Sequence, residues 1–281
     1  MFSVYGGSSV FDIAAPEEKD WPHQVQGLLR EKGFSQVEVI NAGIPGHATL
    51  DCLGRFLTEG HLFQPDYVVL YSSWNDVKFF GETKPLLRVL TPFDQKADPL
   101  LNYRNTLDRF LGEHSQLYVR LRYRYFLWKL GDKVGMEGLS RKDRRSQITA
   151  EGLRQYEVIL KTFVDLVRNA GAEPILMTEA RLVARPHTEA QEKRIGYEYQ
   201  KLVPAALWEA LDKADQILSD VAQSKNVLLI DASKEMTGKE IFFLDHVHLT
   251  PEGSRELAKR TAQAMLEQFE KNPTGMPHAD L

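Results

Sequence analysis

The sequence has 281 residues, of which 43% are hydrophobic and 26% charged, and this composition is typical of a globular chain rather than a disordered one. The formal net charge of −4 argues against a nucleic-acid partner, because such proteins carry broad basic surfaces. No stretch approaches the roughly 20 consecutive apolar residues of a membrane-spanning helix.

The single cysteine and the first residues bear on the cellular compartment. Cys52 cannot form an internal disulfide, and its apolar helical surroundings predict a buried, inert thiol. Met1 is followed at once by a short apolar run and a Gly-Gly turn, which is not the pattern of a signal peptide. The chain as written is therefore expected in the cytoplasm, and exported or anchored if an N-terminal leader has been lost.

Short apolar runs bounded by turn residues indicate strands. The runs are continuous rather than alternating, which is typical of strands covered on both faces. The five expected strands are Phe2–Tyr5, Val37–Ile40, Tyr67–Tyr71, Pro174–Met177 and Val227–Ile230.

Helical patterns separate these strands. The expected helices are Trp21–Lys32, Leu50–Phe63, Gly152–Ala170, Glu189–Ser224 with a break at Pro204, and Glu252–Phe269. Alternating strands and helices predict an α/β fold with a parallel sheet between two helical layers. We expect one domain over residues 1–281, with a helical insertion or cap at about 77–150, where no convincing strand occurs.

Polar and small residues follow several of the strands, at the edge where ligands bind in open parallel sheets. Ser8 follows a Gly-Gly turn after the first strand, so its hydroxyl and nearby N–H groups would face that edge. For Ser8 alone, a helix N-cap is the commoner explanation.

Asp245 and His248 form the second cluster. A serine hydroxyl needs a neighbouring base, and a histidine oriented by an aspartate supplies one. A metal site built from Asp245, His246 and His248 is the alternative, but no second ligand cluster with suitable spacing accompanies it. We therefore expect no metal and no cofactor.

Gly46 and Asn75 also lie at predicted strand ends. A backbone N–H at Gly46 and the Asn75 amide would complete, with the Ser8 N–H, three donors for an oxyanion.

Together, Gly7-Ser8, Gly46 in Asn-Ala-Gly-Ile-Pro-Gly, Asn75-Asp76 and Asp245-x-x-His248 resemble the four motif blocks of the SGNH/GDSL hydrolase superfamily. The resemblance implies a three-layer α/β/α sandwich of flavodoxin-like type with a five-stranded parallel sheet. It also implies that Ser8 is the nucleophile, His248 the base and Asp245 its orienting partner, and that Ser8, Gly46 and Asn75 form the oxyanion hole.

Two residues depart from the family pattern. Gly7 stands in place of the aspartate of Gly-Asp-Ser, and Ser73 in place of the glycine of Gly-x-Asn-Asp. Trp74, in the variable position, and His47, beside Gly46, are candidate substrate-binding residues. Simple core packing of Trp74 and a turn-flanking role of His47 are the alternatives.

The resemblance implies a serine esterase that forms an acyl-enzyme on Ser8, with O-acetyl groups on a carbohydrate as one substrate. An O-acyltransferase using the same triad and a non-catalytic glycan-binding protein are the alternatives. A nucleotide-binding flavodoxin-like protein has less support, because the P-loop lysine and a G-x-G-x-x-G pattern are both missing.

The segment 116–145 carries nine basic and three acidic residues, interleaved with aromatic ones. This pattern suggests contact with an anionic glycan or a membrane surface. A solvated helix whose arginine stems cover the core is the alternative. The sequence does not predict the oligomeric state.

Overall fold

A computed structural model of the chain describes residues 1–16, 18–81, 105–115, 117, 118, 121, 122, 125 and 144–271. Its centre is a five-stranded sheet in the order β2-β1-β3-β4-β5, in which every neighbouring pair is parallel. The strands are β1 (Phe2–Gly6), β2 (Val39–Gly43), β3 (Tyr67–Tyr71), β4 (Glu173–Met177) and β5 (Leu228–Ile230). This order and direction confirm the flavodoxin-like α/β prediction.

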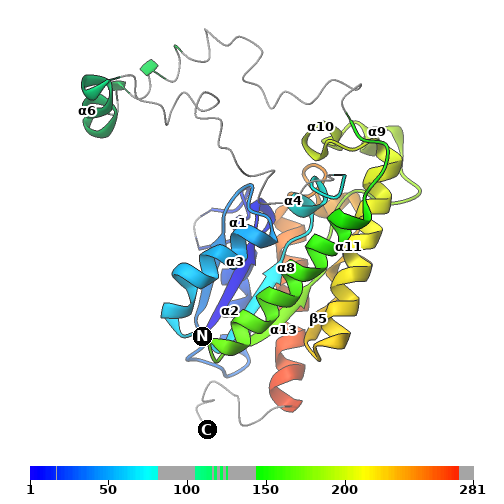
Figure 1. The fold of residues 1–281 in the computed structure, drawn as a ribbon. Helices are drawn as coiled ribbons and strands as arrows, with labels where there is room; N and C mark the ends of the chain where they lie inside the picture. Colours follow the sequence, from blue (N-terminus) through cyan, green and yellow to red (C-terminus); the bar gives the residue numbers. More distant parts are fainter. Residues whose placement is uncertain are drawn as a thin grey trace.

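Helices cover both faces of the sheet (Figure 1). The long helices are α2 (Trp21–Glu31), α3 (Thr49–Thr58), α8 (Ala150–Asn169), α11 (Pro204–Ser224) and α13 (Pro251–Lys271). The short ones are α1 (Ser8–Phe11), α4 (Trp74–Val77), α6 (Thr106–His114), α9 (Glu189–Glu192), α10 (Tyr197–Gln200) and α12 (Ala232–Met236). The helices α3, α8 and α11 pack on one another over one face, and α2 packs on α13 over the other.

Each face of the sheet has its own apolar layer, and β3 shows why. Its successive side chains point to opposite faces, so Val68 and Leu70 belong to the layer under α3, α8 and α11. Tyr67, Val69 and Tyr71 belong to the layer under α2 and α13. All five are nearly inaccessible to solvent. The continuous apolar run at residues 67–71 therefore follows from burial on both faces, as predicted.

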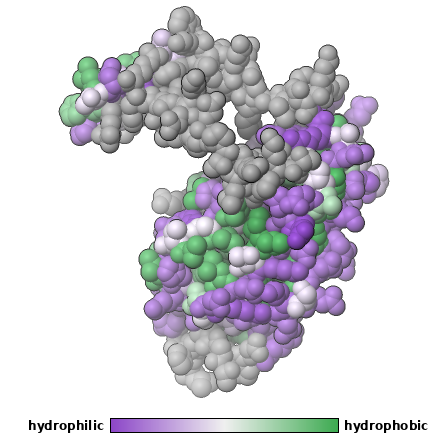
Figure 2. Space-filling view, viewed as in Figure 1, coloured by the Kyte–Doolittle hydropathy of each residue, from purple (hydrophilic) through white to green (hydrophobic). Residues whose placement is uncertain are grey.

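The outer surface of the α3, α8 and α11 face mixes mostly hydrophilic residues with a smaller group of hydrophobic ones (Figure 2). In the described parts of the chain, no helix is long and apolar enough to cross a membrane. Cys52 on α3 is 1% exposed, as expected, and burial raises the pKa of its thiol well above the usual value.

Two helix predictions were wrong in extent. The helix expected at Leu50–Phe63 ends at Thr58, and a 3₁₀ turn follows at Gly60–Phe63. A side chain at Gly60 would overlap the Tyr5 hydroxyl, so the chain turns close against β1 at this point. The helix expected at Glu189–Ser224 is three helices, α9, α10 and α11, and Pro204 begins α11 rather than dividing a longer helix.

Other boundaries also moved. β2 was expected at Val37–Ile40 but runs from Val39 to Gly43, so residues assigned to the following loop pair with β1 instead. The helix α12 and a 3₁₀ turn at Glu240–Phe242, neither of them predicted from the sequence, lie between β5 and Asp245. The expected insertion at 77–150 contains α6, but residues 82–104 and most of 116–143 lie outside the described residues.

Candidate active site

Ser8, His248 and Asp245 come together at the carboxyl edge of the sheet. The Ser8 hydroxyl oxygen lies 2.8 Å from Nε2 of His248. The other ring nitrogen of His248, Nδ1, lies 2.6 Å from Oδ2 of Asp245. The imidazole therefore bridges a hydroxyl and a carboxylate, which is the arrangement that allows it to take a proton from the hydroxyl.

The spacing of three residues between Asp245 and His248 closes a tight loop. Oδ1 of Asp245 accepts the N–H groups of Val247 and His248, both at 2.9 Å. Its second oxygen, Oδ2, faces the imidazole. Aspartate side chains commonly accept hydrogen bonds from backbone N–H groups a few residues ahead, and here these bonds orient the carboxylate toward the imidazole ring. The loop leads directly into α13, which begins at Pro251.

The electrostatics of this loop favour an ionised aspartate. Burial alone would raise the pKa of Asp245, but the hydrogen bonds from the His248 ring and from two backbone N–H groups outweigh it. The net effect holds the pKa of Asp245 well below its usual range. Burial lowers the pKa of the neighbouring His246, and the negative charge of Asp245 partly opposes this shift.

The turn before Ser8 needs residues without side chains. A β-carbon on Gly7 would stand 2.4 Å from Nδ2 of Asn75 and 3.1 Å from the carbonyl oxygen of His47. A β-carbon on Gly6 would stand 2.2 Å from the Tyr71 carbonyl oxygen. The loops that follow β1, β2 and β3 therefore meet at Gly7. This close approach gives a physical reason for glycine where the Gly-Asp-Ser form has aspartate.

Gly46 and Asn75 belong to this meeting point. Gly46 has a φ of +85°, a left-handed conformation that favours glycine, and among the described residues its N–H makes no backbone hydrogen bond. Asn75 donates one Nδ2 hydrogen to the His47 carbonyl oxygen at 2.8 Å, which leaves the second hydrogen for another acceptor. His47 thus reaches the site through its main-chain carbonyl.

Trp74, the residue before Asn75, is buried. Its side chain is 4% exposed, and its ring stacks on His246 with 4.4 Å between the ring centroids. The His246 ring lies 5.9 Å from that of His248. The stacked pair of Trp74 and His246 therefore lies next to His248. In the described residues, no group of three or more histidine, cysteine, aspartate and glutamate side chains is placed to hold a metal ion.

Glu179 is a polar residue at this site that the sequence analysis missed. It follows β4, is 4% exposed, and accepts hydrogen bonds from three residues. Oε1 accepts from the Ser9 hydroxyl at 2.7 Å, and Oε2 accepts from the N–H groups of Ser73 and Trp74 at 2.7 and 2.6 Å. One buried carboxylate thus ties the loop that carries Ser8 to the loop that carries Asn75. The rule used for the other strand ends, applied to β4, would have found it.

Asp76 is the second buried carboxylate near the site. It accepts from the N–H and the hydroxyl of Thr49 and from the Ser72 hydroxyl, at distances of 2.9–3.2 Å. It therefore fastens the start of α3 to the loop after β3. Burial raises the pKa of Asp76 to about 7, although these hydrogen bonds oppose the shift.

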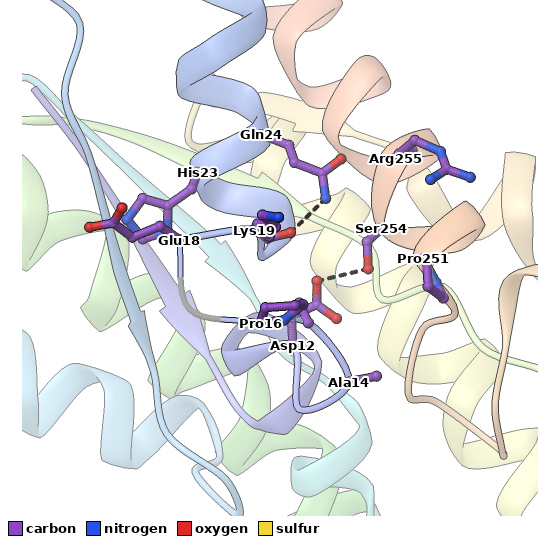
Figure 3. A pocket seen from close by; sticks show the side chains of 11 residues that line it. Asp12, Ala14, Pro16, Glu18, Lys19, His23, Gln24, Pro251, Ser254 and Arg255 are labelled. Atoms are coloured by element: carbon purple, nitrogen blue, oxygen red, sulfur yellow. Dashed lines mark hydrogen bonds between the residues drawn. The ribbon is translucent and has the colours of Figure 1, made fainter.

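A cavity of about 340 Å³ lies between the loop after α1 and the start of α13 (Figure 3). Asp12, which lines it, donates its backbone N–H to the Ser8 carbonyl oxygen and accepts at its carboxylate from the Ser254 hydroxyl at 2.7 Å. Burial raises the pKa of Asp12. Pro251 lines the opposite side, three residues after His248. Ser8, Asp245 and His248 are not among the residues that line this cavity.

Little of the basic segment 116–145 falls within the described residues. Arg122, at 8% side-chain exposure, pairs with Asp108 on α6 at 3.2 Å. Arg145 pairs through its backbone with Lys201 and Val203. These two arginines take part in internal contacts, and the prediction of a membrane or glycan surface stays a prediction for the rest of the segment.

The parallel sheet and the Ser–His–Asp arrangement together define an α/β protein of hydrolase type. The model of the GDSL-like lipase/acylhydrolase family matches residues 5–256, and the chain belongs to that family. The resemblance noted from the four motif blocks is therefore confirmed at the level of the family.

Solved structures with the same fold include an acetyl xylan esterase named AlAXEase (TM-score 0.54, 18% identity, 94% of this chain and 99% of that one). A lipase/acylhydrolase from Enterococcus faecalis is similar to the same degree (TM-score 0.55, 17% identity, 95% of each chain). A variant of Axe2, an acetyl xylan esterase from Geobacillus stearothermophilus, also matches (TM-score 0.52, 16% identity, 94% and 93%). At such identities the likeness shows the fold. The comparison with curated protein sequences returned no match.

Proposed function

We propose that this protein is a carboxylester hydrolase that acts through an acyl-enzyme on Ser8. The observation that carries the proposal is the continuous hydrogen-bonded path from the Ser8 hydroxyl to His248 at 2.8 Å and on to Asp245 at 2.6 Å. A non-catalytic binding protein has no need for this alignment across 240 residues of sequence.

In the proposed reaction, Ser8 Oγ attacks the ester carbonyl carbon while its proton passes to Nε2 of His248. The carbonyl oxygen becomes an oxyanion, held by the N–H groups of Ser8 and Gly46 and by the free Nδ2 hydrogen of Asn75. His248 then returns the proton to the leaving alcohol oxygen as the C–O bond breaks. Water attacks the acyl-enzyme with the same proton shuttle, which releases the carboxylic acid and restores Ser8.

Labelling with a fluorophosphonate probe, followed by intact mass measurement, tests the proposal. We expect one adduct on the parent protein, none on Ser8→Ala and a much slower adduct on His248→Ala. Ser224→Ala, a serine at the end of α11, is the control and keeps the adduct. A folded parent protein that forms no adduct would contradict the proposal.

For the substrate we propose a small acyl group, acetyl above all, on a carbohydrate. Two of the similar structures are named acetyl xylan esterases, and the buried Trp74–His246 pair lies next to the His248 ring, where bulk would favour a small acyl group. Release of acetate from acetylated xylo-oligosaccharides tests this step. Acetylated sugar formed with an added sugar acceptor, instead of free acetate, would favour the acyltransferase alternative.

We propose that the cavity between the loop after α1 and the start of α13 holds part of the alcohol portion of the ester. Its volume suits a sugar-sized group, and Lys19, Gln24 and Arg255 give it polar walls (Figure 3). Ala14→Trp should then raise KM for an acetylated oligosaccharide and leave KM for p-nitrophenyl acetate unchanged. An equal change in KM for both substrates would show that the cavity does not bind the alcohol portion of the ester.

A further inference from the structure

Two consecutive residues of α10 hold the short helix that carries Asn75. Gln200, which is fully buried, donates from Nε2 to the Trp74 carbonyl oxygen at 2.8 Å. Tyr199 donates its hydroxyl to Oδ1 of Asn75, also at 2.8 Å. The helix α10 therefore contacts both the backbone next to Asn75 and the side chain of Asn75 itself.

The Tyr199 contact decides which way the Asn75 amide faces. An amide presents a donor on one side and an acceptor on the other, and a half-turn exchanges them. Here the oxygen meets the Tyr199 hydroxyl while the nitrogen meets the carbonyl oxygen of His47. In the reversed orientation, the amide oxygen would face the His47 carbonyl oxygen, and two acceptors would oppose each other. The nitrogen also lies on the Gly7 side, next to Ser8.

Lys78 fixes the direction of the Tyr199 hydrogen bond. Its ammonium group lies 3.2 Å from the Tyr199 hydroxyl oxygen and 5.0 Å from the centre of the Tyr199 ring. An ammonium group can only donate, so the Tyr199 oxygen accepts from it and its own hydrogen is left for Asn75. Each bond in such a chain polarises the next, so the positive charge of Lys78 makes Tyr199 a stronger donor.

The same segment of chain reaches the other half of the site. The Gly196 N–H and the Arg194 carbonyl oxygen both lie 3.3 Å from Nδ1 of His246, which is two residues before His248. The described segment 194–200 thus spans from the Asp245–His248 loop to the Asn75 loop. None of the motif blocks includes it.

We infer that Tyr199 is a positioning residue that holds the Asn75 amide with its nitrogen toward the oxyanion, with Lys78 setting the direction of its hydrogen bond. The inference rests on the proposed ester hydrolysis at Ser8. Without the hydroxyl of Tyr199, only the His47 carbonyl oxygen holds the amide, which then turns more readily and presents its oxygen lone pairs to the negative charge.

Tyr199→Phe tests the inference because it removes one oxygen and keeps the ring against Lys78. Loss of a whole oxyanion donor costs about 10²–10³ in kcat, and an indirect loss should cost less, about 10- to 100-fold. We expect kcat for p-nitrophenyl acetate and the maximal rate of fluorophosphonate labelling to fall in this way, with KM little changed. A packing defect would instead lower the melting temperature.

Tyr67→Phe is the matched control. Tyr67 begins β3, at the opposite end of that strand from Ser72 and the Asn75 loop, so the same chemical change there should leave kcat unchanged. A fall in kcat of similar size in Tyr67→Phe would overturn the inference, because the effect would then not depend on Asn75.

A double-mutant cycle separates action through Asn75 from a direct effect. In the Asn75→Ala background, Tyr199→Phe should have almost no further cost, because the group that it positions is gone. Independent, multiplicative losses would overturn the inference. A parent protein that reacts with the probe and a Tyr199→Phe variant that reacts equally fast would overturn the inference alone. A parent protein that does not react would overturn the proposed function and the inference with it.

Discussion

The amide nitrogen of Asn75 occupies the space that a side chain on residue 7 would need. A β-carbon on Gly7 would lie 2.4 Å from Nδ2 of Asn75, well inside contact distance. The amide cannot easily withdraw, because the His47 carbonyl oxygen and the Tyr199 hydroxyl hold it at both ends. The absence of a side chain before Ser8 is thus coupled to the position of the expected oxyanion donor.

Gly7→Ala should therefore disable the site while the fold persists. The added methyl group displaces Asn75, and we expect kcat to fall by about 10²–10³, as for loss of an oxyanion donor. Gly27→Ala is the control, because a β-carbon on Gly27 in α2 meets nothing within 4 Å. That change should keep full activity and add about 0.5–1 kcal/mol of stability. Full probe labelling of a folded Gly7→Ala variant would contradict the prediction.

A substitution of Glu179 should lower both the stability of the fold and the reactivity of Ser8. In the parent protein the Glu179 carboxylate oxygens accept from several donors, and in Glu179→Gln an NH₂ group replaces one of these oxygens. At least one donor then loses its acceptor. An unpaired buried donor costs about 1–3 kcal/mol, so the free energy of unfolding should fall by that amount. The labelling rate should fall too, because the loops of Ser8 and Asn75 lose their shared anchor.

Glu173→Gln provides the comparison for Glu179. Glu173 begins β4, its side chain is 43% exposed, and its contact with Arg168 is 3.8 Å long. Exposed pairs of this kind contribute little, so the change should cost less than about 0.5 kcal/mol in a urea unfolding experiment. If the two variants lose equal stability, the anchoring role of Glu179 is wrong.

Asp245 predicts a loss of rate with little loss of structure. In Asp245→Asn, the carboxylate that orients the His248 ring becomes an amide, and the ring then favours the wrong tautomer for accepting the Ser8 proton. We expect labelling to slow by about 10²–10⁴. Asp212→Asn on the exposed side of α11 should label at the parent rate. An Asp245→Asn variant as fast as the parent would show that Asp245 does not orient the base.

The sequence predicted the parts of this site that lie within short motifs. Ser8 and His248 are 240 residues apart, yet the strand-end rule and the motif blocks placed them together. Tyr199 could not be found in this way, because its contact with Asn75 depends on how α10 packs on α4. The long helix predicted at Glu189–Ser224 hid that contact, because the sequence did not reveal the breaks around Gly196 and Lys201 that separate α10 from α9 and from α11.

Asp76 predicts a pH dependence of stability. Its pKa is raised to about 7 in the folded protein, against an ordinary value of 3.8. The folded protein therefore holds a proton on Asp76 between about pH 4 and pH 7 that the unfolded chain has released. The free energy of unfolding contributed by this group is greatest below pH 4, falls as the pH rises to about 7, and is constant above that.

Asp76→Asn removes this titration because an amide stays neutral. The free energy of unfolding of the parent protein minus that of the variant should decrease from pH 5 to pH 8. The decrease should be about 1.4 kcal/mol for each pH unit up to about pH 7. Urea unfolding at several pH values measures this difference, and other titrating groups largely cancel in it. Asp220→Asn, at an exposed position on α11, is the control for removing one carboxylate. A parent–variant difference that is constant or grows with pH would show that Asp76 is ionised throughout this range.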